Sequence, residues 1–303
     1  DLNYTITSGT VTMSTGSSWT VATLGKAATA SSVTVTGYGD VDEGTDIVLA
    51  GSTFTFNASG LSDSDGLHID ASNLSGAGTL KGSQQADTIT GSAQADSITG
   101  GNGVDDYLGG AGNDALILTE TVAAADNVTM TSATNGMDTV TGFDFGGGAS
   151  NDNIVLTIPN TGDIAGGGTG TDTNVSTAIN AGGATITALA ANTAAGAGND
   201  FVLVAVGDAS AVALTATQAV IEAAVAAKMA DGAADIAANI TAATEGFVFL
   251  FPNDANADGT VDSYFLGAYF ADATFATTAA ADINIIGIFN DADAANAAAA
   301  DFT

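Results

Sequence analysis

Four nine-residue repeats follow one another without a gap from Gly82 to Ile117, and read GSQQADTIT, GSAQADSIT, GGNGVDDYL and GGAGNDALI. Each copy has glycine at position one, aspartate at position six and a large apolar residue at position eight. A unit of this length cannot bury its own apolar residue, so successive units must stack and share a core. The repeat therefore predicts a parallel β-solenoid whose short strands are joined by glycine- and aspartate-rich turns.

The same turns have the chemistry of a calcium site. Glycine permits the positive φ values that turn backbone carbonyls toward an ion, and aspartate supplies the hard oxygen that Ca²⁺ prefers. The first two copies lack the second and third glycines, whereas the last two are complete. The candidate ligands are the carboxylates of Asp87, Asp96, Asp105 and Asp114, the carbonyls of Gly100, Gly101, Gly103, Gly109, Gly110 and Gly112, and the neighbouring Asn113.

On these positions, residues 82–117 resemble the RTX repeats of proteins that Gram-negative bacteria export through type I secretion systems. The resemblance implies a β-roll that binds several Ca²⁺ ions. It also implies a chain that stays unfolded at the low calcium of the cytosol and folds outside the cell. The C-terminal residues Asp301–Thr303 resemble the uncleaved export signal of such proteins.

The charge balance excludes several classes of partner. The chain has 34 acidic residues against 3 lysines and no arginine, a formal charge of −31, yet 46% of its residues are hydrophobic, enough to form a core. So few basic side chains argue against binding to nucleic acid, phosphorylated substrates or anionic membranes. We expect no membrane span, because no apolar run reaches the necessary length, and no disulfides, because there is no cysteine.

A second acidic motif lies near the C-terminus, at residues 254–262. Its oxygen-bearing residues follow the spacing of an EF-hand loop, but the twelfth position is Phe265 and both flanks are typical of strands. We therefore expect a calcium loop at the tip of a hairpin, with a metal-free turn as the alternative. The candidate ligands are Asp254, Asn256, Asp258 and Asp262.

The expected fold class is mainly β: the RTX solenoid flanked by β-rich segments, with one or two helices and a β cap in the C-terminal third. We divide the chain into a β-rich lead-in that can begin the solenoid (1–81), the RTX β-roll (82–117), a β-rich segment with a loop insertion at 162–174 (118–200), and a C-terminal cap (201–303). Apolar spacing predicts a helix over 217–230 and a shorter one to about 243.

We expect no enzyme activity. The one histidine, His68, lies in an alternating strand pattern, and no zinc-protease, nucleophile-elbow or phosphate-loop motif is present. Two functions remain open. One is an extracellular, cell-surface structural protein that assembles with itself, most like RTX-type S-layer proteins, with cell-surface polysaccharide as a partner for a region not in this chain. The other is the C-terminal calcium-folding and secretion module of a larger secreted enzyme, toxin or adhesin; since the chain starts at Asp1, we expect a processed or truncated portion.

Overall fold

A computed structural model describes residues 2–6, 19–26, 32–34, 41–51, 53–60, 66–131, 136–146, 150–157, 186–188, 201–203, 209–229, 246–270 and 283–290. The chain divides into two compact units. Unit 1 comprises residues 1–129, 134–144 and 148–154, and unit 2 comprises 130–133, 145–147 and 155–303.

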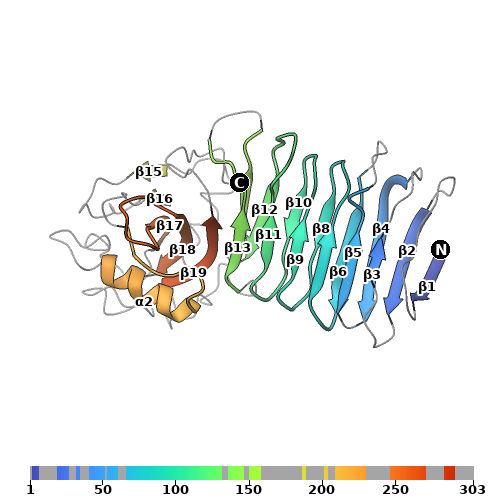
Figure 1. Cartoon of the computed structure of the whole chain (residues 1–303), viewed down its shortest axis with the longest axis horizontal. Helices are drawn as coiled ribbons and strands as arrows, with labels where there is room; N and C mark the ends of the chain where they lie inside the picture. The colour runs from blue at the N-terminus through green and yellow to red at the C-terminus, as the bar shows by residue number, and fades with distance from the viewer. Residues whose placement is uncertain are drawn as a thin grey trace. The chain divides into compact units, whose positions relative to one another are not determined.

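Unit 1 is a parallel β-solenoid in which the chain passes alternately between two sheets (Figure 1). The strands of the first sheet are β1 (Leu2–Ile6), β2 (Trp19–Lys26), β4 (Val41–Gly51), β6 (His68–Leu74), β8 (Thr88–Thr90), β10 (Asp106–Leu108), β12 (Asn127–Thr131) and β14 (Asn153–Thr157). Those of the second sheet are β3 (Ser32–Thr34), β5 (Phe54–Asn57), β7 (Gly78–Lys81), β9 (Ser97–Thr99), β11 (Ala115–Ile117) and β13 (Asp138–Thr141). Neighbouring strands from β1 to β12 in the first sheet, and from β3 to β13 in the second, run parallel.

The solenoid core is a stack of the apolar residues at position eight of each repeat. Each nonapeptide strand has three residues, and its central side chain points inward because side chains alternate across a strand. Ile89 pairs in register with Tyr107, and Ile98 with Leu116. All of these side chains are buried, and the same stack continues beyond the repeats with Val128 and Val140. The expected β-roll is therefore confirmed.

Unit 2 contains a β-meander, one described helix and two short strands. Strands β17 (Gly246–Asn253), β18 (Ser263–Phe270) and β19 (Ile283–Asn290) pair antiparallel, whereas β15 (Ile186–Ala188) and β16 (Phe201–Leu203) extend the sheet in parallel. Helix α2 (Gln218–Met229) buries Ile221, Val225, Ala226 and Met229. The expected apolar stripe is found only in part, because Val220 is 53% exposed. Gln218 Nε2 donates to the carbonyl of Ile285 over 3.0 Å, which ties the start of the helix to β19.

Three expectations lie outside the described residues. They are the loop insertion at 162–174, the shorter helix expected up to about residue 243, and the signal-like end at Asp301–Thr303. The division of the chain into four segments remains a prediction.

Candidate metal centre

The parallel coils arrange the repeat aspartates in two columns, one along each edge of the solenoid. Turns that lead from the second sheet to the first carry one column, and turns that lead back carry the other. Stacking extends both columns beyond the nonapeptides. The first column consists of Asp87, Asp105, Asp126 and Asp152, and the second of Asp96, Asp114 and Asp138. All seven side chains are buried.

Each column is held by a ladder of hydrogen bonds between coils. The Asp87 amide donates to Asp105 Oδ1 over 2.7 Å, and the Asp105 amide donates to Asp126 Oδ1 over 2.8 Å. The Asp126 amide donates to Asp152 Oδ1 over 3.0 Å. In the second column the Asp96 and Asp114 amides donate to the Oδ1 atoms of the next members, Asp114 and Asp138, over 2.7 and 3.0 Å. One oxygen of each of these accepting carboxylates thus satisfies a buried amide of the preceding coil.

The first two nonapeptides use serine at position two to satisfy the remaining carboxylate oxygen. The Ser92 amide donates to Asp96 Oδ2 and its hydroxyl donates to Asp96 Oδ1 over 3.1 Å. Ser83 makes the same pair of contacts with Asp87. In these two turns, hydrogen-bond donors of the same turn therefore stabilise the carboxylate.

The two glycine-complete turns have a different geometry. Gly101, Gly103, Gly110 and Gly112 have φ values between +102° and +129°. A side chain at Gly110 would also overlap the carbonyl oxygen of Ser92 in the coil before it. Glycine is therefore required at this position both by conformation and by the close approach of two coils.

At these turns, and at the turn that follows the last repeat, buried carboxylate oxygens have no hydrogen-bond donor. Among the described residues, Asp105 Oδ2, Asp114 Oδ2 and Asp126 Oδ2 are buried and accept no hydrogen bond. The Glu120 Oε1 atom is also buried and accepts no hydrogen bond. Buried charge without a partner is costly, so these oxygens are where a bound cation would do most to stabilise the fold.

The pKa values show how strongly burial opposes ionisation at these sites. Burial, with the neighbouring charges of Asp87 and Asp126, raises the pKa of Asp105 to about 9. Burial also raises the pKa of Asp114 to about 7 and that of Asp126 to about 7. Without a cation, the folded solenoid must therefore bind protons or hold charges that destabilise it.

The position-eight residue of the third copy also contributes to this edge. Tyr107 is the only tyrosine at that position in the four copies. Its hydroxyl accepts the Gly100 amide over 2.9 Å and donates to the Ile117 carbonyl over 3.1 Å. Burial, followed by the charges of Asp126 and Asp105, raises the pKa of Tyr107. The hydroxyl thus links the starts of two successive turns in the first column.

The C-terminal acidic motif forms the tip of the hairpin between β17 and β18, as expected. Its side chains accept backbone amides of their own loop: Asp254 Oδ2 accepts from Gly259 over 2.7 Å, and Asn256 Oδ1 accepts from Asp258 over 2.9 Å. Asp262 Oδ2 accepts more weakly from the Asn256 amide over 3.3 Å. The oxygens therefore turn toward the inside of the loop, and calcium binding there stays a prediction.

Sequence reasoning missed two column members outside the repeats, Asp126 and Asp138, and also Glu120 beside them, whereas it interpreted Asp152 as a turn residue first and a ligand second. Asp126 follows Asp105 by 21 residues, and Asp138 follows Asp114 by 24, whereas the two repeats of one coil give a spacing of 18. The longer turns hide the periodicity. An aspartate directly before an alternating strand, as at Asp126 and Asp152, is the signal that could have found them.

A comparison with protein families matches residues 81–116 to the RTX calcium-binding nonapeptide repeat (4 copies). Comparisons with characterised proteins and with solved structures give no match. The solenoid thus contains RTX repeats, which bind Ca²⁺, and four copies imply several ions. RTX repeat proteins are typically secreted. No helix in the described part of the chain is long and apolar enough to cross a membrane.

Proposed function

We propose that this protein is an extracellular structural protein, a calcium-dependent subunit of a bacterial surface layer or filament. It leaves the cell unfolded through a type I secretion system and folds when it meets Ca²⁺ outside. The observation that carries the proposal is the set of buried, unpartnered carboxylate oxygens in the two aspartate columns.

These oxygens make folding conditional on a cation. In the absence of metal, burial of Asp105 and Asp114 opposes their ionisation, so folding works against the free energy of burying charge. Extracellular calcium modules bind Ca²⁺ with dissociation constants of about 10⁻⁴–10⁻³ M. The concentration of free calcium in the cytosol is far below these values, so the sites stay empty inside the cell. Metal binding outside the cell therefore becomes folding free energy.

We place the ions first at the glycine-complete turns. Asp105 and Asp114 each offer a free oxygen there, and the turn glycines supply carbonyls. Asp87 and Asp96 remain candidate ligands, but they would exchange the Ser83 and Ser92 amide contacts for an ion. The hairpin loop at 254–262 is proposed as an independent site.

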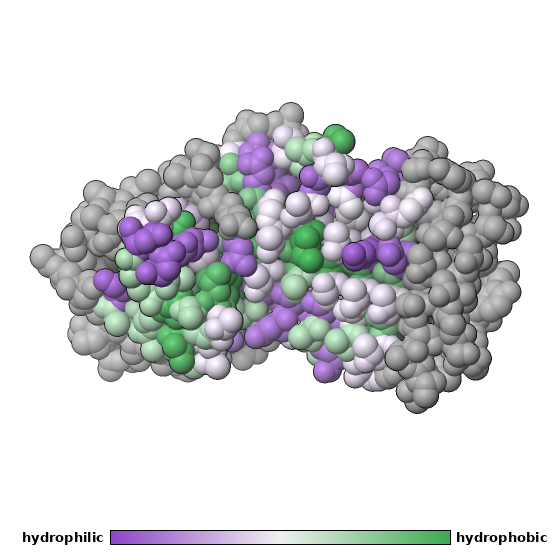
Figure 2. All heavy atoms as spheres, viewed as in Figure 1, coloured by the Kyte–Doolittle hydropathy of each residue, from purple (hydrophilic) through white to green (hydrophobic). Residues whose placement is uncertain are grey.

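Surface and charge support a structural role. Outward strand positions of the repeats carry small hydroxyl residues, such as Thr88, Thr90 and Thr99. In the view of Figure 2, hydrophilic, neutral and hydrophobic residues alternate in small patches. A charge of −31 repels a second copy, so ions that bridge neighbouring acidic surfaces would control assembly. We propose no catalytic role, because the sequence has a single histidine, His68 of strand β6, and none of the catalytic motifs considered above.

The test combines circular dichroism with electron microscopy, in calcium and after exhaustive removal of metal. We expect a β spectrum and ordered sheets or filaments in calcium, and loss of both without it. Calcium-dependent folding without assembly would instead support the secretion module of a larger protein. Equal structure and assembly in both conditions would refute the proposal as a whole.

A further inference from the structure

The turn at residues 118–126 occupies a place in the first column that a glycine-rich turn would otherwise take. It follows the last nonapeptide and reads LTETVAAAD, without a glycine. It therefore lacks the residues that expose carbonyls in the preceding turn at 100–105. Its distinctive feature is an additional acid, Glu120, three residues into the turn.

Three carboxylates meet at this turn, and each is anchored through one oxygen. Asp105 Oδ1 accepts the Asp87 amide over 2.7 Å, Asp126 Oδ1 accepts the Asp105 amide over 2.8 Å, and Glu120 Oε2 accepts the Ala124 amide over 2.7 Å. The other oxygen of each carboxylate is buried and accepts no hydrogen bond. Asp105 is fully buried and Asp126 is 1% exposed, so water does not compensate these charges freely.

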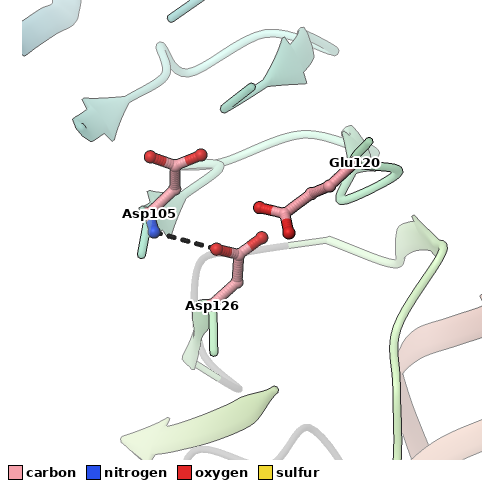
Figure 3. Close-up of side chains that lie close together, drawn as sticks. All are labelled: Asp105, Glu120 and Asp126. Atoms are coloured by element: carbon pink, nitrogen blue, oxygen red, sulfur yellow. Dashed lines mark hydrogen bonds between the residues drawn. The ribbon is translucent and has the colours of Figure 1, made fainter. Parts of the chain in front are cut away.

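The three side chains lie close together, with the carboxylates of Glu120 and Asp126 facing each other and that of Asp105 nearby (Figure 3). A carboxylate oxygen of each lies within 4.8 Å of one from the others. Three oxygens with these separations lie within about 2.8 Å of a common point, close to the length of a calcium–oxygen bond of about 2.3–2.6 Å, so a small movement of the side chains brings all three onto one ion. We propose that the ion beside Asp105 is completed by Glu120 and Asp126, so that these three residues form one Ca²⁺ site in which the Glu120 carboxylate replaces the glycine carbonyls of a repeat turn; this inference rests on the calcium binding proposed above.

The ligand set selects a hard divalent cation. All three ligands are carboxylate oxygens, which suit Ca²⁺, Mg²⁺ and Mn²⁺, whereas Zn²⁺ sites usually include histidine or cysteine. Three charges on one ion also favour tight binding, because calcium affinity rises with ligand charge. Mg²⁺ keeps several of its waters and demands near-octahedral geometry, which three carboxylates held on backbone amides, two of them buried, do not readily offer.

Neighbouring contacts position this turn without belonging to the site. Asn102 Oδ1 accepts the amide and the hydroxyl of Thr121, over 3.0 and 2.9 Å. Asn102 Nδ2 donates to Gln84 Oε1 over 2.6 Å, so three successive turns of the column are connected. Tyr107 links the turn to Gly100, which places a tyrosine ring beside the cluster.

The site is tested with Glu120→Gln, which removes the charge and keeps the size. The matched control is Glu222→Gln in helix α2, another partly buried glutamate that accepts hydrogen bonds, from Gln218 Nε2 over 3.0 Å and the Ile285 amide over 3.3 Å. Titration calorimetry with Ca²⁺ on the full chain counts the ions. Tb³⁺, which occupies calcium sites and is excited through nearby tyrosine, reports on the position of the ion in the wild type and in Tyr107→Phe.

We expect Glu120→Gln to lose one ion, or to weaken one class of sites about tenfold or more, while Glu222→Gln binds like the wild type. We also expect Tyr107→Phe to lose part of the Tb³⁺ emission. Should Glu120→Gln fail to fold, Glu120→Asp, which keeps the charge but withdraws the carboxylate, must show the same loss. Unchanged calcium stoichiometry and affinity in the Glu120 variants would overturn the proposed site. That result would leave the proposed function intact, because the glycine-complete turns would still fold with calcium.

Discussion

Neutralising Asp114 should affect the metal-free and the calcium-bound protein in opposite directions. Burial raises the pKa of this carboxyl from 3.8 to about 7. Ionising it in the metal-free fold near neutral pH therefore costs about 4 kcal/mol, at about 1.36 kcal/mol for each unit of pKa. Asp114→Asn removes that cost but keeps the Oδ1 that accepts the Asp96 amide.

The new amide nitrogen takes the place of Oδ2, which has no partner, and leaving a buried donor unsatisfied costs about 1–3 kcal/mol. The net gain expected for the metal-free fold is thus about 2 kcal/mol. In calcium the variant lacks a charged ligand, so we expect its calcium midpoint of folding to rise about tenfold or more. Both effects follow from a single charge that only an ion stabilises.

Urea unfolding, followed by circular dichroism at several calcium concentrations, measures both the stability of the metal-free fold and the calcium midpoint of folding. The control is Asp106→Asn, which removes the same charge from an exposed side chain in the same solenoid and should change little in either condition. If Asp114→Asn changes the free energy of unfolding by the same amount with and without calcium, no ion binds this carboxylate. The assignment of Asp114 to an ion would then be wrong.

Three further predictions concern a serine-containing turn, a glycine-complete turn and the pH dependence of the metal-free protein. Ser92→Ala removes the hydroxyl that donates to Asp96 and accepts the Gln94 amide, and should cost about 1–2 kcal/mol equally with and without calcium in urea unfolding. Gly110→Ala should lower the thermal midpoint in both conditions, because φ is +102° and the added carbon meets the preceding coil. Metal-free protein should lose stability as pH rises, because the folded state keeps a proton on Asp105 up to about pH 9 while the unfolded carboxyl loses it near 3.8; a urea midpoint that rises between pH 5 and pH 8 would contradict this.

The nonapeptides made the solenoid predictable because their period is regular. Position eight identified the buried stack of Ile89, Ile98, Tyr107 and Leu116, and position six identified the aspartates of the central coils. The hairpin at 254–262 and the helix before it could also be predicted, since each depends on local turn chemistry or apolar spacing.

Which carboxylate oxygens receive hydrogen bonds could not be predicted in the same way. Asp96 and Asp114 occupy the same position of the repeat, yet the first accepts two donors from Ser92 and the second has an oxygen without any. The serine was visible in the sequence. Its effect depends on the turn conformation that brings the amide and the hydroxyl onto the carboxylate.

The sequence by itself determined the period, the inward apolar residues and a surplus of acid that requires cations. Only the tertiary structure decided which acids share a column, because stacked coils align residues by strand register and not by their distance along the chain. Asp126 and Glu120 lie outside any repeat, but the register of β12 on β10 brings them beside Asp105. Burial by the neighbouring coils then determines which of those charges needs an ion.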